Sequence, residues 1–183
     1  MTRASTAPVL KRDLSAAYVR SRLEYDLESG VFTWRLRRVR RQYDVSWNTR
    51  FFEKTAGSLD KDGYVTINLR GKHYRAHQLA WLYVNGVWPP HELDHCDRDK
   101  SNNRLLNLRP ATKSQNAVNT AAPKNNRSGR KGVIWQAHAR KWRARIKVEG
   151  RTIHLGYFDL IEEAADAYRE AANRHFGAFA AIA

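Results

Sequence analysis

The spacing of apolar residues predicts short helices and strands in the first half of the chain. A short amphipathic helix is predicted near the start by apolar residues at helical spacing, namely Leu14, Tyr18, Val19 and Leu23. Residues 31–34 and 64–69 predict strands, and residues 77–86 predict a helix that ends near its glycine. The strongly basic stretch 35–50 predicts no regular element.

Two strands and a helix are predicted in the middle of the chain. Residues 92–95 and 105–109 are strand-like and are separated by a long polar loop. A helix opens in the stretch 111–116, where Thr112 and Gln115 have the spacing of a capping box. The predicted order is therefore strand, loop, strand, helix.

The last third of the chain has a different pattern. Residues 121–130 are small, polar and basic, and they predict a linker. Three strand-like runs follow, at 132–139, 141–148 and 151–158. An alanine-rich helix is predicted over 159–177, with Asp159 as its N-cap and Gly177 at its end.

Alternation within the middle run predicts how this sheet packs. The residues expected to pack on the helix are Trp142, Ala144, Ile146 and Val148. The residues expected on the opposite face are the cations Arg143, Arg145 and Lys147. The patterns together predict an α+β fold whose second part is a small three-stranded antiparallel sheet packed on one helix.

Composition narrows the possible partners. Lys and Arg number 33 and Asp and Glu 18, which gives a formal net charge of +15 and favours a polyanion, above all nucleic acid. No stretch approaches the roughly 18 apolar residues of a membrane span, and the start lacks an apolar signal core. The single cysteine, Cys96, excludes an internal disulfide and Cys-x-x-Cys zinc ribbons. We expect a cytoplasmic protein that is not secreted and does not bind membranes.

The Asp94-His95 pair is the candidate chemical centre. The spacing of Asp97, Asp99 and Ser101 resembles the opening of an EF-hand calcium loop. However, Asn102 stands where that loop needs glycine and Leu108 where it needs glutamate. Zinc is excluded because the His and Cys residues near the pair are too few for its ligands. Asp, Asn and water oxygens suit Mg²⁺ or Mn²⁺ instead.

Residues 73–119 resemble an HNH endonuclease of the ββα-metal class, in the variant whose last His is replaced by Asn. The matching positions are His77, Asp94-His95, Asn102-Asn103-Arg104, Asn107-Leu108-Arg109 and Ser114-Gln115-Asn116. The chain looks like the branch found in phage and intron-borne homing endonucleases. Its N-terminal region also resembles the leader of those proteins.

This resemblance implies roles for individual residues. His95 would be the general base, and an ordinary imidazole pKa of about 6.5 suits that work. Asp94 and Asn116 would hold one divalent ion, Mg²⁺ or Mn²⁺, with no zinc and no small-molecule cofactor. Asn107 would brace the loop and orient the base. Asn119 is interpreted as a surface residue, with metal binding as its alternative role.

Arginines near this motif have two interpretations. Arg104 and Arg109 could grip phosphates of the substrate, or they could be solvated surface residues.

Residues 131–176 resemble an Apetala-type, ethylene-response-factor-like DNA-binding domain. The resemblance rests on 131–146 and 154–177, especially Leu155-Gly156-Tyr157-Phe158. It implies that the sheet contacts DNA through Lys131, Trp135, Trp142, Arg143, Arg145 and Arg151. Arg140 and Lys147 are added to this set because they are cations on or between the predicted strands. Trp142 could equally belong to the core. Because Lys131 and Ile134-Trp135 replace an arginine-rich first strand, no base preference is transferred.

Together these patterns predict a metal-dependent DNA endonuclease that acts as a monomer on double-stranded DNA, nicking it or cutting both strands. The domain prediction is a flexible N-terminus at 1–12, an N-terminal nuclease domain at 13–120, a linker at 121–130 and a DNA-binding domain at 131–183. The alternatives are a non-catalytic DNA-binding transcriptional regulator and an RNA-binding or RNA-cutting protein. The set of Asp94, His95 and Asn116 favours the nuclease.

Overall fold

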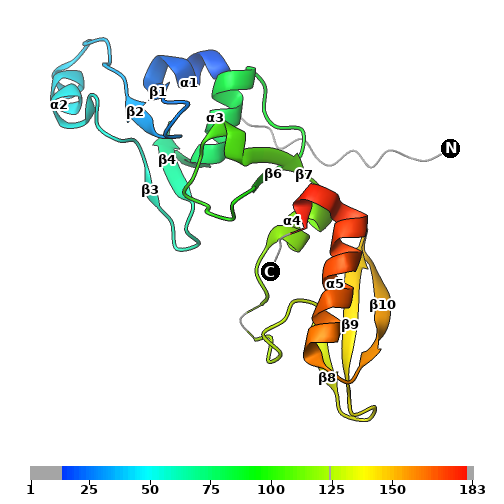
Figure 1. Cartoon of the computed structure of the whole chain (residues 1–183). Coiled ribbons are helices and arrows are strands. Elements are labelled where there is room, and N and C mark those ends of the chain that lie inside the picture. Colours follow the sequence, from blue (N-terminus) through cyan, green and yellow to red (C-terminus); the bar gives the residue numbers. More distant parts are fainter. Residues whose placement is uncertain (1–13, 124, 181–183) are drawn as a thin grey trace. The chain divides into compact units, whose positions relative to one another are not determined.

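The computed structural model describes residues 14–123 and 125–180 and divides the chain into two compact units (Figure 1). Within the described part, the first unit comprises residues 14–89 and 100–106. The second comprises residues 90–99 and 107–180. The predicted domain at 13–120 therefore contributes to both units. The predicted flexible N-terminus, 1–12, lies outside the described residues.

The first unit opens with a helix and a β-hairpin. The elements are α1 (Ala16–Arg22), β1 (Leu23–Tyr25), β2 (Phe32–Trp34) and, later in the chain, α3 (Ala76–Asn85). Ser15 caps α1 by accepting a hydrogen bond from the backbone of Tyr18 at 3.1 Å. The predicted helix at 77–86 is confirmed, and it ends at Gly86, whose φ of 77° lies in the left-handed region.

A three-stranded antiparallel sheet completes the first unit. Its strands are β3 (Ser58–Leu59), β4 (Val65–Leu69) and β5 (Lys72–Arg75), in the order β3-β4-β5. The predicted strand at 64–69 is confirmed as β4. The basic stretch 35–50, for which the sequence predicts no element, contains the helix α2 (Gln42–Phe51). Trp47 is the one buried residue of α2, so the helix lacks a continuous apolar face that the sequence could reveal.

The N-terminal hairpin holds the segment 100–106, which lies between the two central strands in the sequence. The Tyr25 hydroxyl donates to the carbonyl of Asn103 at 2.7 Å. Gly30 has a φ of +73°, and a Cβ there would lie 2.4 Å from the backbone nitrogen of Arg104. Only glycine fits this turn, so the predicted leader region acts as a support for that loop segment.

The second unit begins with two strands and a helix. β6 (Glu92–His95) pairs antiparallel with β7 (Leu108–Ala111), and α4 (Lys113–Asn119) follows. β7 starts three residues later than predicted, because Leu105–Asn107 form a 3-10 turn, η1. The predicted capping box is confirmed: Thr112 accepts from the Gln115 backbone at 3.2 Å, and Gln115 accepts from the Thr112 backbone at 2.8 Å.

The predicted three-stranded sheet packed on one helix is confirmed in the same unit. It contains β8 (Val133–Gln136), β9 (Lys141–Val148) and β10 (Arg151–Phe158), in the order β10-β9-β8, with α5 (Ile161–Phe176) on one face. A short 3-10 turn, η2 (Gly177–Phe179), follows α5. One of its core clusters consists of Val133, Ala144 and Ala164.

Two details differ from the sequence-based predictions. Asp159 does not cap α5; it pairs with Lys141 at 3.1 Å, and the helix begins after Leu160. Val118 of α4 belongs to a second core cluster together with Ile146, Ala172 and other residues of the C-terminal sheet and helix. The helix of the central motif and the C-terminal module therefore share buried apolar surface, across the predicted linker.

Candidate active site

β6 presents the Asp94-His95 pair from a buried position. Asp94 is 8% exposed and His95 is 5% exposed. Successive residues of a strand point to opposite faces, so Glu92 and Asp94 share one face of β6, and both contact α4. His95 is directed to the other face.

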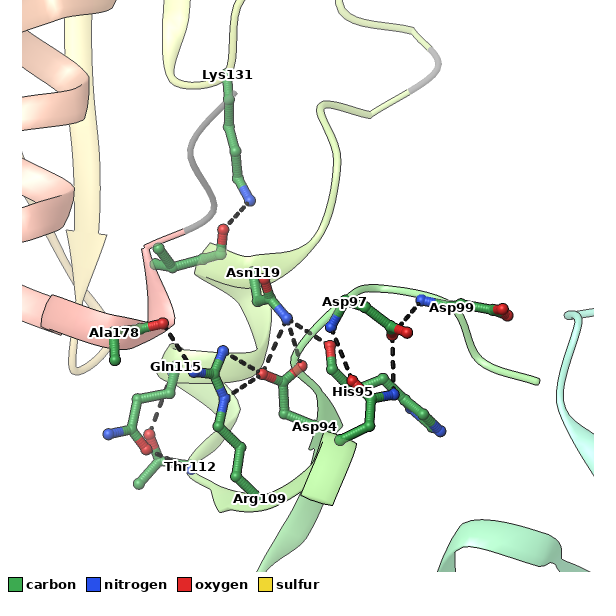
Figure 2. A network of polar contacts seen from close by, with 12 residues as sticks. Asp94, His95, Asp97, Asp99, Arg109, Thr112, Gln115, Asn119, Lys131 and Ala178 are labelled. Carbon is green, nitrogen blue, oxygen red and sulfur yellow. Dashed lines mark hydrogen bonds and ion pairs between the residues drawn. The ribbon is translucent and has the colours of Figure 1, made fainter. Parts of the chain in front are cut away.

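The carboxylate of Asp94 is held by two side chains (Figure 2). Arg109, its direct cross-strand neighbour on β7, donates from Nε and Nη2 to Oδ2 at 2.9 and 2.7 Å. Asn119 of α4 donates from Nδ2 to Oδ1 and Oδ2, both at 2.9 Å. Both carboxylate oxygens therefore accept hydrogen bonds, and the guanidinium balances the negative charge of a buried group.

Asn119 is not the surface residue that the sequence predicted. It is only 4% exposed, and its Nδ2 also donates to the backbone carbonyl of His95 at 2.8 Å. One turn earlier, Asn116 donates to Glu92 Oε2 at 3.0 Å. The step from Glu92 to Asp94 along β6 therefore corresponds to the step from Asn116 to Asn119 along α4. As a result, Asp94 contacts Asn119 and not Asn116.

Asn107 ties together the loop that follows His95. Its Nδ2 donates to Asp97 Oδ1 at 2.9 Å, and its Oδ1 accepts from the Asp97 backbone at 3.1 Å. The carbonyl of Asn107 accepts from the Cys96 backbone at 2.9 Å. Asp97 also accepts from the backbone of Asp99 at 2.8 Å. These contacts fix the backbone directly after His95.

Arg109 is not presented as a phosphate-binding side chain. Besides Asp94, it donates from Nη1 to the carbonyl of Ala178 at 2.7 Å (Figure 2). Its guanidinium carbon lies 3.9 Å from the centroid of the Phe179 ring. The turn η2 after α5 thus helps to keep Arg109 on Asp94. Sequence reasoning missed this relationship because residues 109 and 178 are far apart in the chain.

Lys131 is also directed inward, against its predicted role as a DNA contact. Its Nζ donates to the carbonyls of Ala117 and Val118, both at 2.7 Å, and to the carbonyl of Thr120. These are carbonyls at the end of α4, where a helix leaves them without a partner of its own. Burial, and to a smaller extent the charge of Arg98, lowers the pKa of Lys131 to about 8. Lys131 therefore stabilises the helix that carries Asn116 and Asn119.

The C-terminal sheet has one open face that carries cations, as predicted. Ala144 and Ile146 are buried, whereas Arg145 and Lys147 are exposed. The strand register adds neighbours to this face: Arg143 pairs with Tyr157, Arg145 with His154 and Lys147 with Thr152. We call this surface the open sheet face and define it by Arg143, Arg145, Lys147, Thr152, His154 and Tyr157.

A β-bulge creates part of the open sheet face. The register of β10 shifts between His154 and Gly156, so that His154 and Tyr157 lie on the same face although they are three residues apart. Their rings contact each other with centroids 4.8 Å apart. Sequence reasoning missed both residues, because regular alternation places them on opposite faces.

The remaining predicted DNA contacts take different positions. Trp135 and Trp142 are register partners with ring centroids 5.1 Å apart, and Trp142 packs on the core cluster with Val133. Both therefore lie on the helix side of the sheet rather than on the open sheet face. Arg140 and Arg151 are exposed beside the turns at opposite ends of β9, and Arg104 is exposed in the first unit.

The donor types around Asp94 suit a hard divalent ion. Among the described residues, no three His, Cys, Asp or Glu side chains gather as metal ligands. A carboxylate with two nearby carboxamides, from Asn116 and Asn119, supplies oxygen donors of the kind that Mg²⁺ and Mn²⁺ prefer. Arg109 and Asn119 donate three hydrogen bonds to Oδ2 of Asp94 and one to Oδ1, so Oδ1 keeps a lone pair that a cation could use.

Comparison with known proteins gives the motif a family. A family model described as HNH endonuclease matches residues 74–118. Protein 3.8 of Escherichia phage T7 is 36% identical over 107 residues, which are 58% of this chain and 88% of that protein. An uncharacterized HNH endonuclease of Acanthamoeba polyphaga mimivirus, L560, is 33% identical over 124 residues, 67% of this chain and 64% of that protein. No solved structure matches the chain significantly.

The position of the family match corrects one prediction. The matched segment, residues 74–118, lies in the middle of the chain and not at its N-terminus. It does not reach residues 131–176, so the resemblance of that segment to an Apetala-type domain stays a prediction.

No helix among the residues that the structure describes is long and apolar enough to cross a membrane.

Proposed function

We propose, from the match of residues 74–118 to the HNH endonuclease family, that the chain hydrolyses phosphodiester bonds of double-stranded DNA with His95 as the general base. The observation that carries the proposal is the buried Asp94-His95 pair on β6, whose Asp94 contacts a carboxamide of α4, within the segment that matches the family.

His95 would take the proton from the water molecule that attacks phosphorus. Two features of the chain support this role. Asn119 holds the His95 carbonyl at 2.8 Å, and Asn107 fixes the next loop through the Cys96 and Asp97 backbones. Together they hold the backbone of His95 and of the two residues after it, and a base held in place loses little entropy on reaching the transition state.

Asp94 and Asn116 would hold one divalent ion, Mg²⁺ or Mn²⁺. When bound, such an ion would stabilise the charge that develops on the phosphate and on the leaving oxygen. We assign Asn116 rather than Asn119 because Asn116 is bonded to the exposed Glu92 and can exchange that partner. The buried Asn119 instead holds Asp94 and the His95 carbonyl. Asn119 and Arg109 are therefore positioning residues.

The open sheet face would bind the DNA duplex. Its cations Arg143, Arg145 and Lys147 lie along one strand, and His154 and Tyr157 add donors and aromatic surface. A small sheet of this kind can enter the major groove and reach phosphates and base edges. Arg140 and Arg151, beside the turns of the same sheet, would add phosphate contacts, and Arg104 would add one from the first unit.

Relaxation of supercoiled plasmid tests the proposed activity. We expect the wild-type protein to nick or cut plasmid in the presence of Mg²⁺ or Mn²⁺ and to be inactive in EDTA. Variants of the open sheet face should bind DNA less tightly and still fold. Failure of the wild-type protein to relax plasmid with Mg²⁺, Mn²⁺ or any other divalent ion would favour a non-catalytic DNA-binding regulator.

A further inference from the structure

A strongly basic segment of the first unit has no role in the functions described so far. Residues 35–54, which we call the cationic arm, carry seven Lys and Arg side chains and two carboxylates. They include the helix α2 (Figure 1). The exposed cations of the arm are Arg35, Arg38, Arg40, Arg41, Arg50 and Lys54.

The cationic arm is folded around one tryptophan. Trp47 is 9% exposed, and its ring centroid lies 5.3 Å from that of Trp34 and 5.1 Å from that of Phe51. The guanidinium carbon of Arg37 lies 3.4 Å from the centroid of the Trp47 ring. Asn48 accepts from the Arg37 backbone at 2.9 Å and donates to its carbonyl at 2.8 Å. The segment before α2 is thereby fixed to the helix.

The carboxylates of the arm do not pair with its exposed arginines. Oδ2 of Asp44 accepts from the backbones of Arg40 and Arg41 at 3.1 and 3.2 Å, which fixes the start of α2. In the described part of the chain, Arg38, Arg40 and Arg41 form no ion pair with any carboxylate. The pKa of Arg37 is lowered by burial and also by the nearby charge of Arg22, so positive charge is crowded at the base of the arm.

Exposed apolar side chains alternate with these cations. Leu36 is 61% exposed, Val39 55% and Tyr43 66%. A merely solvated charged segment has no need for such residues. Arginines mixed with exposed apolar side chains are typical of proteins that bind DNA from the minor groove, where cations meet phosphates and apolar groups meet sugars and bases.

We propose that the cationic arm is a further DNA-binding surface, in which Arg38, Arg40 and Arg41 contact the phosphates of duplex DNA. The arm contains none of the proposed nuclease residues and none of the residues of the open sheet face. The proposal rests on the proposed function only in taking DNA as the partner. The proposal explains why a folded segment displays arginines that have no carboxylate partner among the residues that the structure describes. Each phosphate that these arginines neutralise would release counterions from the DNA.

The test is a binding titration on a protein that cannot cut. The full-length His95→Ala protein is titrated into a fluorescently labelled duplex of about three helical turns in EDTA, at several salt concentrations. The arm variant Arg38→Ala/Arg40→Ala/Arg41→Ala is compared with Lys61→Ala/Arg169→Ala/Arg174→Ala, which removes equal charge from exposed positions elsewhere. The hydrogen bonds that hold Arg40 and Arg41 use their backbone atoms, and Arg37, whose guanidinium lies on Trp47, is unchanged, so we expect the arm variant to keep its fold.

We expect the arm variant to raise the dissociation constant at least tenfold and to reduce the slope of log affinity against log salt by about 2 to 3. The control variant should stay within about threefold, with little change of slope. Equal affinity and slope for the two variants would overturn the proposal. Binding of the same proteins to vesicles of anionic phospholipid is measured as well. If the arm variant lost vesicle binding and kept its duplex binding, the proposal would also be overturned. If the parent protein binds no duplex at all, the proposed function fails as well.

If the triple arm variant unfolds, a single substitution still tests whether the arm binds DNA. The single substitution Arg38→Gln removes one exposed charge and no contact of the arm. It should weaken duplex binding by about threefold and reduce the salt slope by about 1. An unchanged slope would count against the proposal.

Discussion

Arg109 and Asp94 lie directly opposite each other on β7 and β6, and the guanidinium donates two hydrogen bonds, at 2.9 and 2.7 Å, to one carboxylate oxygen. The buried carboxylate is therefore paired with a positive charge before any cation binds. The same guanidinium reaches the carbonyl of Ala178, so the C-terminal module takes part in holding the residue that the nuclease centre depends on.

Removal of the guanidinium should expose the dependence of the fold on this pair. Arg109→Leu leaves Asp94 buried without its counter-charge, so we expect the free energy of unfolding to fall by about 3 kcal/mol. Urea denaturation measures this change. The substitution Arg104→Leu, at an exposed arginine, should change stability by less than about 0.5 kcal/mol. Adding Asp94→Asn to Arg109→Leu should recover part of the loss. An Arg109→Leu protein as stable as the wild type would contradict the clamp.

The two helix carboxamides should separate into a ligand and a positioning residue. Asn119→Ala removes hydrogen bonds to Asp94 and to the His95 carbonyl, and we expect it to lower stability by about 2 kcal/mol. Asn116→Ala removes one contact to exposed Glu92, so stability should stay within about 0.5 kcal/mol.

Metal affinity then distinguishes these carboxamides independently of cleavage. Calorimetric titration with Mn²⁺ should show at least about tenfold weaker binding for Asn116→Ala, while its thermal unfolding stays normal. Mn²⁺ binding by Asn116→Ala that equals wild-type binding would remove Asn116 from the ligands of the ion.

Lys131 should make stability depend on alkaline pH. Its folded-state pKa of about 8 lies below the ordinary lysine value, so between these two values the unfolded chain binds more protons. Stability contributed by this group must therefore rise with pH above about 8. Lys131→Met removes the titrating group, and the stability difference between wild type and variant, from urea titrations at pH 7 to 10, should widen in favour of the wild type. A difference that stays constant with pH would rule out the lowered pKa.

The open sheet face should carry DNA affinity, in contrast to the tryptophans behind it. Arg145→Ala should weaken duplex binding about tenfold with little effect on stability, because this side chain is exposed. Trp142→Ala should instead destabilise the module by about 2 to 3 kcal/mol, because its ring packs on the cluster of Val133 and Ala144. Anisotropy and thermal unfolding, measured on the same samples, separate the two effects. If Arg145→Ala lowered the unfolding temperature as much as Trp142→Ala does, this division of roles would be contradicted.

Local signals in the sequence were sufficient for the parts of the fold that depend on neighbouring residues. The capping box of Thr112 and Gln115, the left-handed end at Gly86 and the alternation in β9 all appear as predicted. The helix α2 was missed because it buries only Trp47, which packs on Trp34 from outside the helix and on Phe51 at the end of the helix. Its apolar pattern is too weak to reveal it.

Contacts that depend on register or on distant segments could not be predicted from local patterns. The bulge that brings His154 beside Tyr157 shifts the alternation by one residue. Lys131 and Arg109 are of the residue types that contact DNA phosphates, but each donates to backbone carbonyl groups of another element. Asn119 has the type of a surface residue, and only the packing of α4 on β6 shows it to be buried against Asp94.

Cleavage and binding measured on the same His95→Ala protein test the central claim most directly. Wild-type protein and variant are incubated with supercoiled plasmid and Mg²⁺, and their binding to a labelled duplex is measured in EDTA. With His95 as the base, plasmid relaxation should fall by at least about a hundredfold while the dissociation constant changes by less than about twofold. A variant that nicks plasmid at the wild-type rate would contradict the account.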